Sequence, residues 1–138
     1  MATISQIRDA IGTRLLTLDQ MRVQDEFGED PPVSANACVA VVQYAGATYD
    51  SVFGGQGDAL LFGVIVLVSR GSDRIAIDTL DALSDPSPGS TTSVRNAVNG
   101  SLGGVVAAAT VATGSDYKDY PIGEQSYVGV EFVVQVMT

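Results

Sequence analysis

The stretch ALLFGVIVLV, residues 59–68, decides the fold. In an extended chain its alternating positions place apolar side chains on both sides: Leu60 and its alternate neighbours on one, and Leu61, Ile65 and Leu67 on the other. A strand of this kind lies in the centre of a sheet that is covered by helices on one side and by something else on the other. We therefore predict a central strand near residues 60–69.

Two explanations of the second apolar side remain open at this point. The strand can be fully internal, with both of its sides covered by its own chain. Alternatively, a domain of this size has too few helices to cover both faces of its sheet, and a contact with another subunit covers the remainder.

Helical patterns lie on both sides of this strand in the sequence. Apolar residues recur at spacings of three and four over residues 3–17, where Thr3 and Gln6 are placed as a capping box. The same spacing returns after the central strand and predicts a helix over residues 72–84 that carries aspartates on its solvated side. A shorter helix is predicted over residues 92–99.

Further strands are expected before and after the helices. ACVAVVQY, residues 37–44, is a short apolar run, and VVAAATVATG, residues 105–114, is a second. The segment 126–137 alternates valine and phenylalanine with polar residues such as Glu131 and Gln135. The order of these elements predicts an α+β fold, with a largely antiparallel β-sheet and helices packed on one face.

Two segments are expected to form loops. Residues 18–36 are polar, rich in turn-forming residues and contain the pair Pro31 and Pro32, which argues against regular structure. Residues 54–57 contain three glycines, so ordering this loop costs much conformational entropy unless a partner supplies contacts. We expect the loop to be mobile in an isolated subunit and to become ordered in an assembly.

Composition limits the class of protein. The 138 residues favour a single domain over residues 1–138, with 46% apolar and 17% charged residues. No apolar run reaches the ~18 residues that a membrane helix needs. The net charge is −9, too acidic for gripping a nucleic-acid backbone. The single cysteine, Cys38, is expected to be a small buried residue.

No residue pattern indicates catalysis, a metal or a cofactor. Histidine is absent, which removes the commonest general base and zinc ligand. The aspartates of residues 73–85 lie along one helix flank, where solvated charge explains them. The segment SPGSTTSVRNAV lacks the lysine and the second glycine of a phosphate-binding loop, so it is interpreted as a turn in which Ser90, Thr91 or Thr92 caps a helix.

The ordered series of motifs resembles the tail terminator proteins of long-tailed phages (siphoviruses) that infect actinobacteria. A short first helix and a Pro-Pro segment precede a Tyr-Asp-x-x-Phe-Gly segment, the hydrophobic strand, an SDR-type helix start, a helix-turn-helix, an LGG turn and VEF.V.V. The matching positions are Tyr49, Asp50, Phe53, Gly54, Ser72, Asp73, Asp85, Gly89, Ser93, Val94, Leu102, Gly103 and Gly104.

The resemblance implies a virion structural protein that is not an enzyme and is assembled in the host cytoplasm. Tail terminators form a homohexameric ring on the head-proximal end of the tail tube, stop polymerisation of the major tail tube protein, and present the surface that joins the head-tail connector or head-closure protein. Genomic DNA passes through the ring without specific binding. The resemblance places subunit contacts in the glycine-rich loop and neighbouring strands, and the candidate interface residues are Tyr49, Asp50, Phe53, Gly54, Gly55, Leu61, Ile65 and Leu67.

Two alternatives to a terminator remain. One is another neck or tail component, such as a head-closure protein or the tube subunit itself, and a tube subunit would form long polymers instead of one ring. The other is a metal-dependent enzyme that uses carboxylates, which requires a cluster of them in a pocket.

Overall fold

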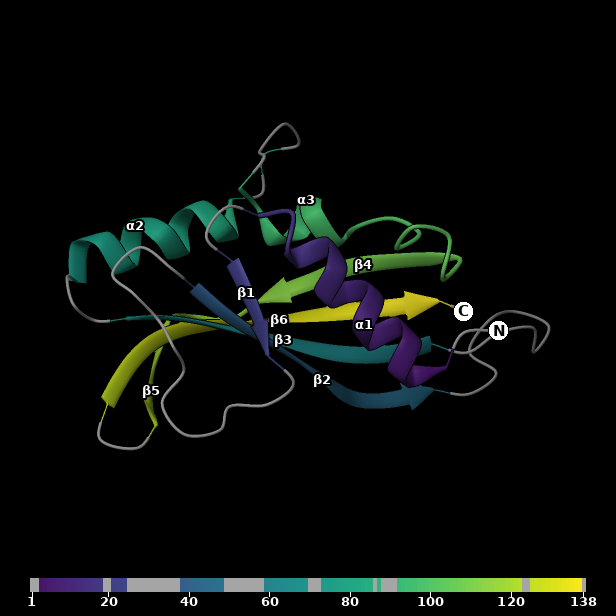
Figure 1. The fold of residues 1–138 in the computed structure, drawn as a ribbon, viewed down its shortest axis with the longest axis horizontal. Coiled ribbons are helices and arrows are strands. Elements are labelled where there is room, and N and C mark those ends of the chain that lie inside the picture. The colour runs from purple at the N-terminus through teal and green to yellow at the C-terminus, as the bar shows by residue number, and fades with distance from the viewer. Residues whose placement is uncertain are drawn as a thin grey trace.

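The computed structural model describes residues 3–18, 21–24, 38–48, 59–69, 73–85, 87, 92–122 and 125–137. Within these ranges the chain has an α+β fold, in which three helices lie over one face of a six-stranded, mostly antiparallel sheet (Figure 1). The elements in chain order are α1 (Ile4–Leu15), β1 (Met21–Gln24), β2 (Cys38–Thr48), β3 (Ala59–Ser69), α2 (Asp73–Ser84), α3 (Val94–Val98), β4 (Ala108–Gly114), β5 (Lys118–Ile122) and β6 (Gln125–Met137).

The sheet is built around β3 and β6. Its strand order is β1-β2-β3-β6-β4. β5 pairs with the first half of β6, and β4 pairs with the second half. The ladder between β3 and β6 is antiparallel and runs without interruption from Ala59 opposite Met137 to Ser69 opposite Tyr127. The prediction of a central strand near residues 60–69 is therefore confirmed, with β3 spanning Ala59–Ser69.

The helix-covered face of the sheet holds the hydrophobic core. Leu60 and the alternate residues after it on β3 are buried there, as are the alternate valines of β6. The helices add Ile7, Ile11 and Leu15 from α1 and Leu80 from α2, all with 0% exposure. Burying each such side chain is worth about 1.5–3 kcal/mol relative to leaving it in water. Cys38 is also buried, as expected.

The cap of α1 is the one that the sequence predicts. Thr3 Oγ1 accepts a hydrogen bond from the Gln6 backbone amide at 3.1 Å, and Gln6 Oε1 accepts one from the Thr3 amide at 2.9 Å. Two of the four amides that a helix start leaves unpaired are thus satisfied reciprocally.

The cap of α3 differs from the expectation. Ser93 is the N-cap, and its buried hydroxyl accepts from the Asn96 amide at 3.4 Å. Thr92 is displaced from that role because its hydroxyl donates to the Ala82 carbonyl near the end of α2, at 3.0 Å. Ser90 and Thr91 lie outside the described residues. The threonine therefore ties the two helices together, and the next hydroxyl along the chain caps α3.

The strand β1 was not expected from the sequence. It lies inside residues 18–36, which were expected to be irregular, and it pairs in parallel with β2, with Met21 opposite Cys38. Four residues are too few to give a recognisable alternation, although Met21 is buried while Arg22 is exposed. Among the described strands, β1 and β2 form a parallel pair, whereas the other pairs are antiparallel.

The start of β4 lies later than predicted. Leu102, Gly103 and Gly104 have φ angles of 52°, 72° and 92°, so the chain turns in the left-handed region there and the strand begins at Ala108 instead of residue 105. Two of these three positions are glycines, which adopt such angles without steric cost.

Candidate functional site

Three of the predicted interface residues lie in the described part of the chain, and all three belong to β3. They are Leu61, Ile65 and Leu67. The others, Tyr49, Asp50, Phe53, Gly54 and Gly55, lie outside the described residues, as does the loop 54–57.

These three side chains point to the face of the sheet opposite the helices, which we call the outer face. Their exposure falls along the strand: Leu61 is 38% exposed, Ile65 is half-buried and Leu67 is 0% exposed. The second side of β3 is thus neither fully internal nor fully open. Its accessible end carries Leu61, whose partner on β6 is the exposed Gln135.

Gly129 and Tyr120 explain the buried end of the outer face. A Cβ added to Gly129 of β6 would lie 2.6 Å from Leu67 Cδ2 and 3.0 Å from Tyr120 Cδ2, so these two side chains fill the space above the glycine. Burial raises the pKa of the Tyr120 hydroxyl above its usual value, and the negative charge of Glu131 raises it further.

A carboxylate covers the middle of the outer face. Glu131 lies opposite Ile65 on β3, and its Oε1 lies 3.0 Å from the position that a Cβ would take on Gly63. The glycine therefore leaves room for the Glu131 side chain to reach across to the neighbouring strand.

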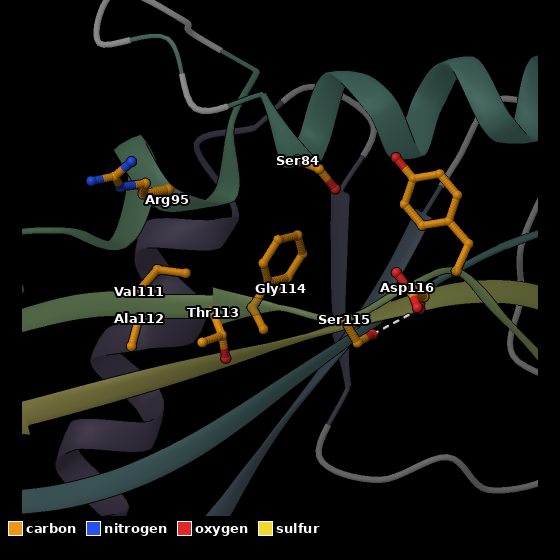
Figure 2. A pocket seen from close by; sticks show the side chains of 10 residues that line it. Ser84, Arg95, Val111, Ala112, Thr113, Gly114, Ser115 and Asp116 are labelled. Atoms are coloured by element: carbon orange, nitrogen blue, oxygen red, sulfur yellow. Dashed lines mark hydrogen bonds between the residues drawn. The ribbon is translucent and has the colours of Figure 1, made fainter.

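A groove of about 510 Å³ lies on the other face, at the outward edge of β4. Figure 2 shows it below the end of α2, with α3 at one end and the chain after β4 at the other. We call it the β4-edge groove. Its lining residues are Ser84, Arg95, Val111, Ala112, Thr113, Gly114, Ser115, Asp116, Tyr117 and Phe132.

Tyr117 forms one wall of the groove. Its hydroxyl donates a hydrogen bond to Asp81 Oδ1 on α2 at 2.5 Å, which anchors the segment between β4 and β5 to the helix. Burial raises the pKa of Tyr117 above 10.0, and the hydrogen bond to Asp81 raises it further. The nearby Ser84 hydroxyl lowers the pKa of Tyr117, although its buried Oγ forms no hydrogen bond with any residue that the structure describes.

The floor of the groove is Phe132 beside the bare backbone of Gly114. A Cβ on Gly114 would lie 3.3 Å from two carbons of the Phe132 ring. Arg95 and Asp116 are exposed, and neither side chain has a charged or hydrogen-bonding partner among the described residues. Within the described residues the groove thus combines an apolar floor with an unpaired cation, an unpaired carboxylate and the unpaired Ser84 hydroxyl.

The β4-edge groove was not expected from the sequence. Its residues come from α2, α3, β4, β6 and the segment after β4, so no local motif marks it. Gly114 at the end of an alternating strand is the one local signal that could have pointed to it.

Neither feature forms an evident metal centre. Among the described residues, no group of three His, Cys, Asp or Glu side chains is placed to hold a metal ion. The helices of the described ranges are all too short or too polar to cross a membrane. No protein-family model matches the chain, and a search of the curated proteins finds no match to it.

Proposed function

We propose that this protein is a tail terminator of a long-tailed phage. Its subunits close into a homohexameric ring on the head-proximal end of the tail tube. The ring stops addition of the major tail tube protein and presents the surface to which the head-tail connector or head-closure protein binds. The subunit is assembled in the host cytoplasm and functions in the virion.

The observation that carries this proposal is the ordered series of motifs between residues 49 and 104. Isolated elements such as the LGG turn are common, whereas their order around one apolar strand is specific. The α+β fold with helices on one face agrees with that order, because each described motif falls at an element boundary: Asp73 begins α2, Ser93 caps α3 and Gly103 lies in the turn before β4.

The outer face supports subunit contact on physical grounds. Leu61 exposes 38% of its surface at the centre of the sheet, and heterologous contacts that close a ring would bury it equally in every subunit. The charge of −9 supports a conduit for DNA, since a basic lumen would retain the phosphates that must pass. We expect the lumen to be lined by acidic or neutral side chains.

Disruption of the gene in the phage tests the function directly. Without a terminator, tube protein continues to add, so electron micrographs should show tails of irregular, excessive length that do not join heads. Complementation with the intact gene should restore uniform tails. Tails of normal length attached to heads in the disrupted phage would contradict the proposal.

The ring is tested with two leucine variants of the purified protein. Leu61→Asp places a charge on the outer face. Leu16→Asp makes the same substitution away from that face, at the end of α1, where the native leucine is 58% exposed. Sedimentation velocity should show a ring for the wild type and for Leu16→Asp, and monomers for Leu61→Asp. Equal behaviour of the two variants would contradict a role for the outer face, and open-ended polymers of the wild type would indicate a tube subunit.

A further inference from the structure

The outward-pointing backbone groups of β4 form hydrogen bonds along the first half of the strand. Ala109 exchanges two backbone hydrogen bonds with Gly100, of 2.6 and 3.0 Å. The Val111 amide donates to Asn99 Oδ1 at 2.8 Å. The chain that follows α3 thus covers the edge as far as Val111, where unpaired strand groups would otherwise attract another strand.

Beyond the register shift between Val111 and Thr113, the outward edge of β4 is no longer covered by the chain that follows α3. The Ser115 amide donates to the Glu131 carbonyl at 2.8 Å, so residue 115 directs its backbone groups towards β6. Backbone groups alternate in direction along an antiparallel strand, and the N–H and C=O of Gly114 therefore point outwards. Among the described residues neither group forms a hydrogen bond outside the β4–β6 ladder, and Gly114 is exposed.

The open edge coincides with the β4-edge groove. The ring of Phe132 lies beside Gly114 and lines the groove with the 4% of its surface that is exposed, and Ser84 Oγ is buried in the opposite wall with no hydrogen-bond partner among the described residues (Figure 2). A strand laid along this edge could exchange hydrogen bonds with Gly114 and place one side chain over Phe132. Main-chain pairing combined with a side-chain pocket is how proteins bind extended peptides at sheet edges.

The charges of the groove give the bound segment a direction. Arg95 projects from α3 at one end and Asp116 lies at the other, and both are unpaired within the described ranges (Figure 2). We infer that the β4-edge groove binds an extended segment of another protein, with an acidic side chain at the Arg95 end, an apolar side chain over Phe132 and a basic side chain at the Asp116 end. This inference does not depend on the proposed function.

A displayed library of random octapeptides, selected against the full-length chain, tests the inference. The enriched peptides should share the order acidic, apolar, basic or its reverse, and fluorescence anisotropy of their synthetic forms should give saturable binding. The double variant Arg95→Glu/Asp116→Lys should weaken that binding about tenfold, since both charge contacts become repulsive. The variant should in turn select peptides of the inverted charge order.

Two further variants separate the groove from general effects. Asp78→Lys changes the charge of α2 at an exposed position that does not line the groove, and it should leave binding unchanged. Gly114→Val places a branched side chain on the open edge, with its Cβ 3.3 Å from two carbons of the Phe132 ring, and should abolish binding while circular dichroism still reports a folded chain. A lack of enrichment, or equal binding by the charge-reversed variant, would overturn the inference. Enrichment of peptides that match this chain's own sequence would overturn the assignment to another protein.

Discussion

Replacing Gly129 by alanine should destabilise the protein strongly, although the change adds a single methyl group. The new Cβ would lie 2.6 Å from Leu67 Cδ2, 2.6 Å from the Val66 carbonyl oxygen and 3.0 Å from Tyr120 Cδ2. Real Cβ atoms do not approach a backbone oxygen so closely, so β3 and β6 would have to separate within the central ladder. Inserting atoms into a packed site costs about 1–3 kcal/mol, and the involvement of backbone puts this case at about 2–3 kcal/mol.

Gly63→Ala provides the matched control on the neighbouring strand. Its Cβ would approach Glu131 Oε1 at 3.0 Å, which is the end of a flexible side chain that can swing towards solvent. Loss of unfolded-state entropy would favour the variant by about 0.4–1 kcal/mol, so its stability should equal or exceed that of the wild type.

Urea unfolding followed by circular dichroism measures both free energies of unfolding. Thermal melts should show a fall of about 6–12 °C in Tm for Gly129→Ala, as a domain of this size loses about 3–4 °C per kcal/mol. The reasoning would be refuted by a Gly129→Ala variant within about 0.5 kcal/mol of the wild type, or by equal losses in the two variants.

Three further changes have defined expectations. Tyr117→Phe removes the hydrogen bond to Asp81 and should lower the free energy of unfolding at pH 8 by about 0.5–1 kcal/mol in urea titrations. Burial, and then that hydrogen bond, raise the pKa of Tyr117 above 10.0. The stability that the protonated hydroxyl contributes is therefore complete below pH 10 and is lost as pH rises through the folded-state pKa. The free energy of unfolding, measured up to pH 11, should thus fall more steeply for the wild type than for the variant. Ser93→Ala removes the cap of α3 and should cost about 1 kcal/mol in the same assay, whereas no loss would contradict its capping role. Leu80→Ala opens a cavity at a fully buried position and should cost about 2–5 kcal/mol; a loss below 1 kcal/mol would show that α2 packs loosely.

The central part of the fold could be predicted because its residues carry a long, regular signal. The alternation around Leu60 and Glu131 assigned the core and outer faces of β3 and β6 correctly, since one face of each strand is buried over its whole length. The capping box of Thr3 and Gln6 was equally visible, because both of its hydrogen bonds form within one helical turn.

Elements that depend on distant partners could not be predicted. β1 becomes a strand only because β2 offers an edge to Met21, and Pro121 is compatible with β5 because that strand pairs on one side with β6. The β4-edge groove likewise depends on residues that are distant in the sequence. Arg95 and Asp116 are ordinary surface charges in the sequence, and only the fold places them at the two ends of one groove.

The position of β6 in the chain has a consequence for biosynthesis. β6 pairs with β3, β4 and β5, yet it follows all of them in the sequence, and Ser69 must wait for Tyr127 to leave the ribosome before their ladder can close. During that interval β3 is a long apolar segment with a free edge, and such segments are prone to intermolecular pairing. The nascent protein should therefore need chaperone protection until translation has passed β6, and chains that stop before it should aggregate.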